Sequence, residues 1–359
     1  MIGPFPPPVH GQSAATLATA EMLADAGFDV RRCDTGEGAS GGRMTRITRL
    51  LSAMMRIMTG SERHIYISAN ANLGMSITFL LCLLARIRGR ALTLHHHAYS
   101  YIGARSGWAA GMAKAAGPNA MHLTQCSGMG AELAARYPVI ARTLPFSNVG
   151  FVEKQTDAGP QQGAFTFGHM SNLTEDKGLG EAVDTLRSAL SDGMDARLVV
   201  AGPCSDDFAT RTVKAAKQEL GQRFEYRGPV YGADKDAFFK DLDLFLFPTR
   251  YRNETQGIVV LEALSYGVPV AAYGQCCVGE TVGPEGGVVA ANDDDFAGVA
   301  LQFAAAYAAD PAGTRAKAHR QFQRHTETHQ RDLDAITAHF HQVAVRMSGS
   351  AAVTQSSPQ

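Results

Sequence analysis

The sequence predicts an α/β fold of two doubly wound domains, each a parallel sheet with helices on both faces. Short apolar runs rich in β-branched residues alternate with segments of helical length, which is the pattern of such sheets. The chain has 359 residues, more than a single hydrophobic core usually holds. Residues 151–163 are polar, contain Gly and Pro, and separate two alternating series, so they are predicted to be a linker.

The first series begins with an unusual start. Only Met1 and Ile2 precede the turn-forming stretch GPFPPP, so the first strand is either very short or trimmed, and the sequence leaves both open. The apolar stretch LGMSITFLLCLLA is shorter than the roughly 20 residues that cross a bilayer, which predicts a buried helix. Strands are expected at residues 64–69, 91–96 and 120–125, and helices at residues 14–26, 43–58 and 74–87.

The second series repeats this scheme and is followed by a helical segment expected to cross back to the first domain. Its strands are expected at residues 164–169, 196–202, 224–228, 242–249 and 268–274. The expected divisions are a first domain at 1–150, a linker at 151–163, a second domain at 164–320, a helical segment at 321–347 and a disordered tail at 348–359.

Charge is distributed unevenly along the chain. The net charge of −1 argues against a dedicated nucleic-acid binder, so no nucleic-acid partner is expected. Between Gly38 and Ala131, however, Glu62 is the only acid, whereas ten residues are Arg or Lys. Such a positive field favours anionic partners such as phosphates or a membrane surface. A solvated, Arg-containing surface without a partner is the alternative.

Cysteine usage and the N-terminal residues favour a cytoplasmic location. The six cysteines show neither zinc-ligand spacing nor the density of secreted disulfide scaffolds. The start has neither the basic nor the apolar region of a signal peptide. We therefore expect a cytoplasmic protein, with peripheral attachment to the inner face of a membrane as an option.

The stretch ETQGIVVLEAL carries the clearest chemical signal. It follows a buried strand and leads into a helix at about Gly257, where free backbone N–H groups and the helix dipole favour a phosphate. Glu254 and Glu262 flank this start, and carboxylates accept bonds from sugar hydroxyls better than they bind phosphate. A helix-capping acid and an unrelated surface Glu are the alternative. The N–H donors expected at the phosphate belong to Thr255, Gln256, Gly257 and Ile258.

These motifs resemble those of the family-4 retaining glycosyltransferases, the group 1 glycosyl transferases. ETQGIVVLEALSYGVPVAA resembles the family's signature of two glutamates separated by seven residues. GPFPPPVHGQS, LTLHHH, SNLTEDKGL, LVVAGP, YRGPV and DLDLFLFPT follow the family's order, from about Gly3 to Ala272. The resemblance implies a GT-B fold, in which two Rossmann-like domains face each other across a cleft.

The resemblance also implies roles for individual residues. Glu254 would bind hydroxyls of the transferred sugar and Glu262 the ribose of the nucleotide. SNLTEDKGL resembles a loop whose Arg and Lys neutralise the diphosphate; Lys177 matches the Lys, but Asn172 stands where the Arg is usual. The sequence therefore departs from the family at one of the two cationic contacts to the leaving group. An exposed lysine before a Gly turn is the alternative for Lys177.

Further positions follow from the other motifs. Gly11 would offer a backbone N–H to the donor phosphate, with Gln12 beside it at the start of a helix. His95 and His97 are expected to share a face, because alternate residues of a strand do so. The resemblance implies that one of the two lies near the transferred sugar and the acceptor. The backbone near Val230 and Tyr231 would contact the nucleobase. His95, His97, Glu254 and Lys177 are the expected catalytic residues.

The function implied is a retaining, metal-independent glycosyltransferase. It would move a sugar from a nucleotide-diphosphate sugar to a hydroxyl of a glycan, a lipid-linked or another acceptor, in surface polysaccharide or glycoconjugate biosynthesis. No cofactor and no metal are expected. A non-catalytic GT-B partner subunit, a sugar-nucleotide epimerase and a phosphorylase of the same architecture remain alternatives. The Arg-rich residues 41–63 suit a lipid-linked or anionic acceptor.

Overall fold

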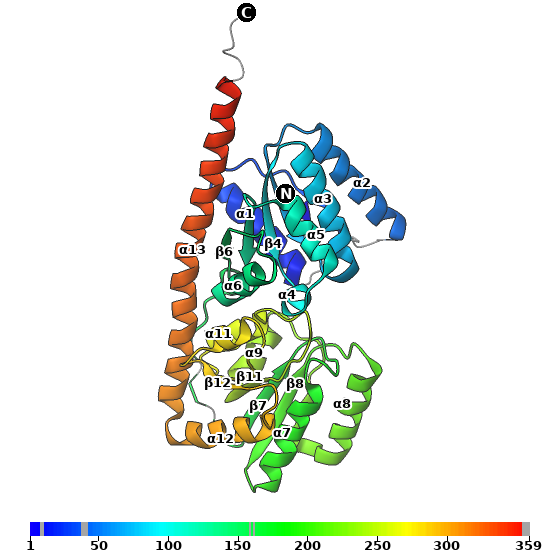
Figure 1. Cartoon of the computed structure of the whole chain (residues 1–359). Coiled ribbons are helices and arrows are strands. Elements are labelled where there is room, and N and C mark those ends of the chain that lie inside the picture. Colours follow the sequence, from blue (N-terminus) through cyan, green and yellow to red (C-terminus); the bar gives the residue numbers. More distant parts are fainter. Residues whose placement is uncertain (8–10, 37–41, 158, 161, 354–359) are drawn as a thin grey trace, which may run out of the picture. The chain divides into compact units, whose positions relative to one another are not determined.

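The computed structural model describes residues 1–7, 11–36, 42–157, 159–160 and 162–353, which form two compact units. The first unit is Met1–Ser147 with Thr328–Gln359, and the second is Asn148–Glu327. Within its described residues, each unit contains one six-stranded sheet with every paired strand parallel. Helices cover both faces of each sheet (Figure 1). This is the doubly wound α/β fold that the sequence predicts.

The sheet of the first unit has the strand order β2-β1-β3-β4-β5-β6. β3 and β4 have the bounds expected from their runs of apolar, β-branched residues, and they pair along their whole length. The strands are β1 (Ile2–Gly3), β2 (Cys33–Asp34), β3 (His64–Ala69), β4 (Ala91–His96), β5 (Met121–Thr124) and β6 (Thr143–Pro145). The helices are α1 (Gly11–Asp25), α2 (Arg43–Thr59), η1 (Asn72–Gly74), α3 (Met75–Ile87), α4 (Ser100–Gly103), α5 (Gly107–Ala116) and α6 (Ser127–Arg136).

The central strand β1 is short although it lies between two others. Ile2 pairs with Cys33 on one side and Ile67 on the other. β3 continues towards its N-terminal end beyond this pairing. A cavity of about 440 Å³ lies there, lined among others by Phe28, His64 and Phe340.

The sheet of the second unit has the order β12-β11-β10-β7-β8-β9, so β10 and β7 are neighbours at its centre. Its strands are β7 (Phe165–Met170), β8 (Ala196–Ala201), β9 (Phe224–Tyr226), β10 (Leu244–Phe247), β11 (Val270–Tyr273) and β12 (Gly287–Ala290). Its helices are η2 (Asn148–Phe151), α7 (Leu179–Ser191), α8 (Asp207–Leu220), η3 (Gly221–Arg223), α9 (Ala233–Lys240), α10 (Ile258–Ser265), α11 (Val278–Val282) and α12 (Phe296–Ala309).

Two apolar clusters hold this second sheet between its helices. One cluster joins the sheet to α7, α8 and α12, and the other joins it to α9, α10, α11 and the start of α13 (Pro311–Val353). The apolar strand β10 is buried along its whole length, and β8 is buried except at Arg197, as expected for a parallel sheet covered on both faces.

Helix α13 belongs to both units and differs from the expected C-terminal segment. It begins at Pro311 and not near residue 321, because proline is favoured at the first helical position. Arg315, in its first part, is fully buried; its guanidinium donates to Asp157 Oδ1 at 2.8 Å and to two main-chain carbonyl oxygens. From Thr328 the helix belongs to the first unit, where Phe340 stacks on His64 at 4.4 Å.

The expected disordered tail is partly wrong. Helix α13 continues to Val353, so residues 348–353 are helical, and residues 354–359 lie outside the described part of the chain. None of the helices in the described ranges is long and apolar enough to cross a membrane.

Buried histidines predict a protein that loses stability in mild acid. Burial lowers the pKa of His122 to about 3 and that of His169 to about 4, and lowers the pKa of His95 and His96 well below the usual 6.5. These imidazoles are neutral when folded, whereas the unfolded chain takes up protons below pH 6.5. The contribution of these neutral histidines to the free energy of unfolding is therefore complete above pH 6.5 and falls as the pH drops towards 4. At pH 5 the loss is about 2 kcal/mol per histidine.

Urea unfolding at pH 7.5 and pH 5 measures this loss. The variant His122→Asn should show a smaller loss than the parent protein, whereas His341→Asn, at an exposed position of α13, should show the same loss as the parent. A free energy of unfolding that is equal at the two pH values would contradict the expectation.

Candidate functional site

The loop after β10 and the start of α10 form the centre of the candidate site. Gly257 precedes the helix at φ 67° and ψ 91°, so α10 begins one residue later than expected, at Ile258. A Cβ at Gly257 would lie 2.9 Å from the Phe247 ring, which leaves no room for a side chain. Gln256 is buried and its side-chain oxygen accepts a bond from the Asn148 N–H at 2.8 Å. Its side chain therefore fixes the loop.

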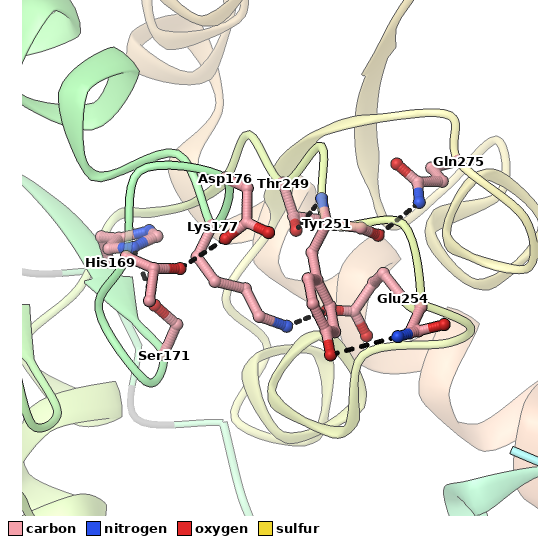
Figure 2. A network of polar contacts seen from close by, with 10 residues as sticks. His169, Ser171, Asp176, Lys177, Thr249, Tyr251, Glu254 and Gln275 are labelled. Atoms are coloured by element: carbon pink, nitrogen blue, oxygen red, sulfur yellow. Dashed lines mark hydrogen bonds and ion pairs between the residues drawn. The ribbon is translucent and has the colours of Figure 1, made fainter. Parts of the chain in front are cut away.

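Both signature glutamates form ion pairs with lysines. Lys177 Nζ lies 2.6 Å from Glu254 Oε2, and Lys235 Nζ lies 2.6 Å from Glu262 Oε1. The first pair is largely shielded from water, with the side chains 18% and 12% exposed. Figure 2 shows Lys177 pointing towards Glu254 and Tyr251, and its ammonium lies 4.2 Å from the centre of the Tyr251 ring. The structure thus places Lys177 and Glu254 together, as the sequence motifs require of one site.

Sheet topology explains why residues 77 positions apart meet. Lys177 follows β7 and Glu254 follows β10, and these parallel strands are neighbours, so both loops leave the same edge of the sheet. The Arg250 N–H donates to the Asp176 carbonyl oxygen at 2.7 Å and ties the two loops together. Gly178, at φ 85°, lies between Lys177 and the first residue of α7 and lets the first loop pass close to Pro248.

Asn172 stands where the family's loop usually carries an Arg, and it is exposed. Next to it, the Ser171 hydroxyl lies 3.2 Å from His169 Nε2, while His169 Nδ1 donates to the Leu246 carbonyl oxygen at 3.0 Å. These bonds orient the end of β7, but they supply no positive charge. Lys177 is therefore the cation that the structure places in this loop.

Sequence reasoning missed several residues of the site. Lys235 lies in α9 and forms an ion pair with Glu262, 27 positions later. No sequence motif around Lys235 predicts this pair. Tyr251 contacts Lys177 through its ring, and its carbonyl oxygen accepts a bond from Gln275 Nε2 at 2.6 Å (Figure 2). Its position shortly after the strand-ending proline and threonine of β10 was the available signal.

The segment near Val230 and Tyr231, which is expected to contact the nucleobase, forms an exposed turn. Tyr231 is 78% exposed, and its carbonyl oxygen accepts a bond from the Asp234 N–H at 3.2 Å. Val230 packs partly against the apolar cluster around α10. The backbone of this turn precedes α9, the helix that carries Lys235.

The acids of the DLD stretch have structural partners. Asp243 is buried and accepts bonds from the Thr166 N–H at 2.9 Å and the Tyr307 hydroxyl at 3.2 Å. Asp241 forms an ion pair with Arg227. Within the described ranges, no group of three or more His, Cys, Asp or Glu side chains is arranged to hold a metal ion.

In the first unit, the two candidate histidines have different environments. The rings of His95 and His97 lie 4.0 Å apart, so they share a face as expected. His95 is fully buried and its Nδ1 lies 2.6 Å from the Tyr66 hydroxyl, whereas His97 is partly exposed. Of the two residues, His97 is the more exposed.

The start of α1 is tied to the end of β3. Gln12 Nε2 donates to Ser68 Oγ at 3.0 Å and to the Ala69 carbonyl oxygen at 3.1 Å. Gly11 is the first residue of the helix and is exposed. The residues Pro8, Val9 and His10 of the same motif lie outside the described part of the chain.

Comparison with solved structures identifies the class of fold. The structure of Anabaena HepE in complex with UDP-glucose matches with a TM-score of 0.67 and 15% identity, over 97% of this chain and 98% of that one. Sucrose-phosphate synthase of Thermosynechococcus elongatus matches with a TM-score of 0.67 and 17% identity, over 95% and 94% of the two chains. Both likenesses cover nearly whole chains, and the expected GT-B architecture of two Rossmann-like domains is confirmed.

Sequence comparison finds a family match within the second unit. Residues 164–305 match the family described as glycosyl transferases group 1, as the motifs predict. A 2-deoxystreptamine glucosyltransferase of Streptomyces kanamyceticus is 31% identical over 126 residues. That match covers 34% of this chain and spans 31% of the length of the relative.

Proposed function

We propose that the protein is a retaining glycosyltransferase that takes its sugar from a nucleotide-diphosphate sugar and needs no metal ion. The observation that carries the proposal is the pair Lys177 and Glu254 at the ends of two adjacent strands, inside the region that matches the group 1 glycosyl transferases. A lysine beside the first glutamate of the signature offers a cation for a diphosphate and a carboxylate for sugar hydroxyls within one site.

The candidate site residues of the second unit have the following roles in this proposal. Lys177 and the N–H groups at the start of α10 stabilise the charge that grows on the departing diphosphate. Glu254 accepts bonds from hydroxyls of the transferred sugar. Glu262, held by Lys235, accepts bonds from the ribose, and the backbone at Val230 and Tyr231 contacts the base.

Retention of configuration is proposed to follow from attack on the same face that the diphosphate leaves. The bond from the anomeric carbon to the diphosphate oxygen breaks, and the acceptor oxygen bonds to that carbon. The proton of the acceptor hydroxyl passes to the leaving diphosphate. His97 is proposed to contact the substrate from the first unit, and Gly11 to offer its N–H to the donor phosphate.

The acceptor is proposed to be a glycan or a lipid-linked molecule of surface polysaccharide or glycoconjugate biosynthesis. The lipopolysaccharide outer core galactosyltransferase WaaB has a similar structure, which supports this class; it matches with a TM-score of 0.62 and 16% identity, over 91% of this chain and 98% of that one. We further propose that the protein works at the surface of a membrane.

Nucleotide binding is the first expected result. In a thermal-shift screen of UDP, GDP and ADP and their sugars, one nucleotide should stabilise the protein, by about 2.7 kcal/mol at 100 times its dissociation constant. Glu262→Ala should weaken this binding because it removes the proposed ribose contact. Glu219→Ala, which breaks an exposed pair with Arg187 in the same unit, is the matched control and should bind like the parent.

Transfer and its stereochemistry are then measured with the purified chain and the nucleotide sugar that binds. NMR of the product, or of the free sugar released to water, should show the anomeric configuration of the donor. Inversion would overturn the retaining mechanism. If no nucleotide stabilised the protein, the donor site itself would be wrong.

A further inference from the structure

Helix α2 presents an apolar stripe to solvent. Met44, Ile47, Leu51, Met55 and Met58, here called the α2 stripe, are between 38% and 71% exposed. Their spacing of three or four residues places them on one face of the helix. Ala53 and Ile57, on the opposite face, are buried against the unit. Helix α2 thus has two apolar faces, of which only one has a partner in the described chain.

The helices next to α2 also expose apolar side chains. α2 packs on α3, and α3 packs on α5; Figure 1 shows the three helices side by side. Leu80 and Ile87 of α3 are exposed and seven residues apart, which places them on one face of that helix. Trp108, at the start of α5, is 49% exposed and packs against Phe79. Exposed apolar side chains gathered on neighbouring helices are what a contact with another molecule would cover.

The positive charge around these exposed side chains restricts which kind of binding partner can cover them. Glu62 is the only acid between Gly38 and Ala131. Exposed bases of the same segment are Arg46, Arg56, Arg63, Arg86, Arg88, Arg105 and Lys114. A second copy of the chain would bring the same basic surface against itself, which disfavours a symmetric dimer through this face. A flat anionic surface suits both the charge and the exposed Leu, Ile, Met and Trp side chains.

We propose that α2 lies in the headgroup region of an anionic lipid bilayer, with the α2 stripe inserted and Trp108 at the interface. The surrounding arginines contact lipid phosphates, and the first unit is thereby held at the membrane. The proposal deepens the proposed function, because it defines the surface by which the enzyme reaches a lipid-linked acceptor. Its test needs no nucleotide, so it can fail or succeed independently of the donor site.

Vesicle binding by the full chain tests the proposal directly. Trp108 is the single tryptophan of the chain, so its fluorescence reports this surface without a label. Vesicles of phosphatidylglycerol and phosphatidylcholine should shift its emission to the blue and sediment the protein, whereas phosphatidylcholine alone should do so much less. Brominated lipid chains should quench the emission. Raising the salt from about 0.05 M to about 0.5 M shortens the Debye length and should weaken binding.

Variants separate the stripe from other exposed apolar residues. Leu51→Asp with Met55→Asp should weaken vesicle binding about tenfold or more. Val345→Asp makes the same kind of change at an exposed position of α13 and should bind like the parent. Because all these side chains are exposed, the melting temperatures should stay close to that of the parent, and nucleotide binding should be unchanged.

Three outcomes would overturn the proposal. The first is a parent chain that binds anionic vesicles no better than neutral ones, and the second is a double variant that binds as well as the parent. In the third, sedimentation equilibrium shows a dimer that the double variant abolishes, so that a second copy and not lipid covers the stripe. Vesicle binding without any nucleotide binding would leave this proposal standing and overturn the proposed function.

Discussion

Replacing Lys177 with Met is expected to lower kcat for sugar transfer by about 10²- to 10³-fold, the usual effect of removing one donor to a developing charge. The diphosphate gains negative charge as it leaves, and Lys177 is the proposed cation at that point. Methionine keeps most of the volume of the lysine stem and its packing on Tyr251. Initial rates at saturating donor measure the effect. The KM for the donor should rise less than kcat falls, because the charge is larger in the transition state than in the bound donor.

A double variant distinguishes the chemical role of Lys177 from its structural role. Lys177→Met leaves Glu254 without its partner in a site where the carboxylate is only 12% exposed, which should cost about 3 kcal/mol of stability. Lys177→Met with Glu254→Gln removes both charges and should recover much of this stability, yet it should remain inactive. If the double variant recovered activity with stability, the pair would serve the fold alone.

The exposed pair Arg187 and Glu219 provides the control. Its side chains are 42% and 49% exposed, so water screens their attraction, and Arg187→Met with Glu219→Gln should leave both stability and kcat nearly unchanged. Equal losses of activity in the exposed and the shielded pair would mean that the assay reports folding and not catalysis.

The parts of the site that the sequence predicts are those set by local pattern. Two glutamates and a glycine at fixed spacing follow a strand that is a continuous run of apolar residues. The position of the loop after β10 could therefore be predicted from the sequence alone. The same holds for β3 and β4, whose short runs of mostly apolar or β-branched residues could be recognised in the sequence. Lys177 could be linked to this loop only through the resemblance. The neighbouring positions of β7 and β10 in the sheet give the physical reason.

The parts that the sequence does not predict depend on contacts made only after folding. Lys235 contacts Glu262 from another helix, and the residues around Lys235 are those of an ordinary surface helix. Arg315 looks like a surface residue, yet it is fully buried because three acceptors from distant segments converge on it. β2 is two residues long, too short for a periodic signal. Alternation of apolar residues indicates an element but does not identify the partners it meets.

Gly178→Ala is expected to destabilise the second unit by about 3 kcal/mol and to weaken donor binding. Gly178 has φ 85°, where a residue with a Cβ is strained by about 1 to 2 kcal/mol. A Cβ there would also lie 2.3 Å from the Pro248 carbonyl oxygen, so the loops after β7 and β10 would have to separate, at a further cost of about 1 to 3 kcal/mol. Since Lys177 and Glu254 lie in these two loops, their 2.6 Å pair should be disturbed as well.

Gly193→Ala isolates the cost of the positive φ, because the two glycines have similar φ angles but differ in the space around them. Gly193 has φ 77°, and no atom lies within 4 Å of the position of its Cβ. This variant should therefore lose only about 1 to 2 kcal/mol and bind nucleotide like the parent. Urea unfolding gives both stability losses, and nucleotide titration gives both affinities. If the two variants were equally stable and bound nucleotide equally well, the close approach of the two loops would not be what holds Lys177 in the site.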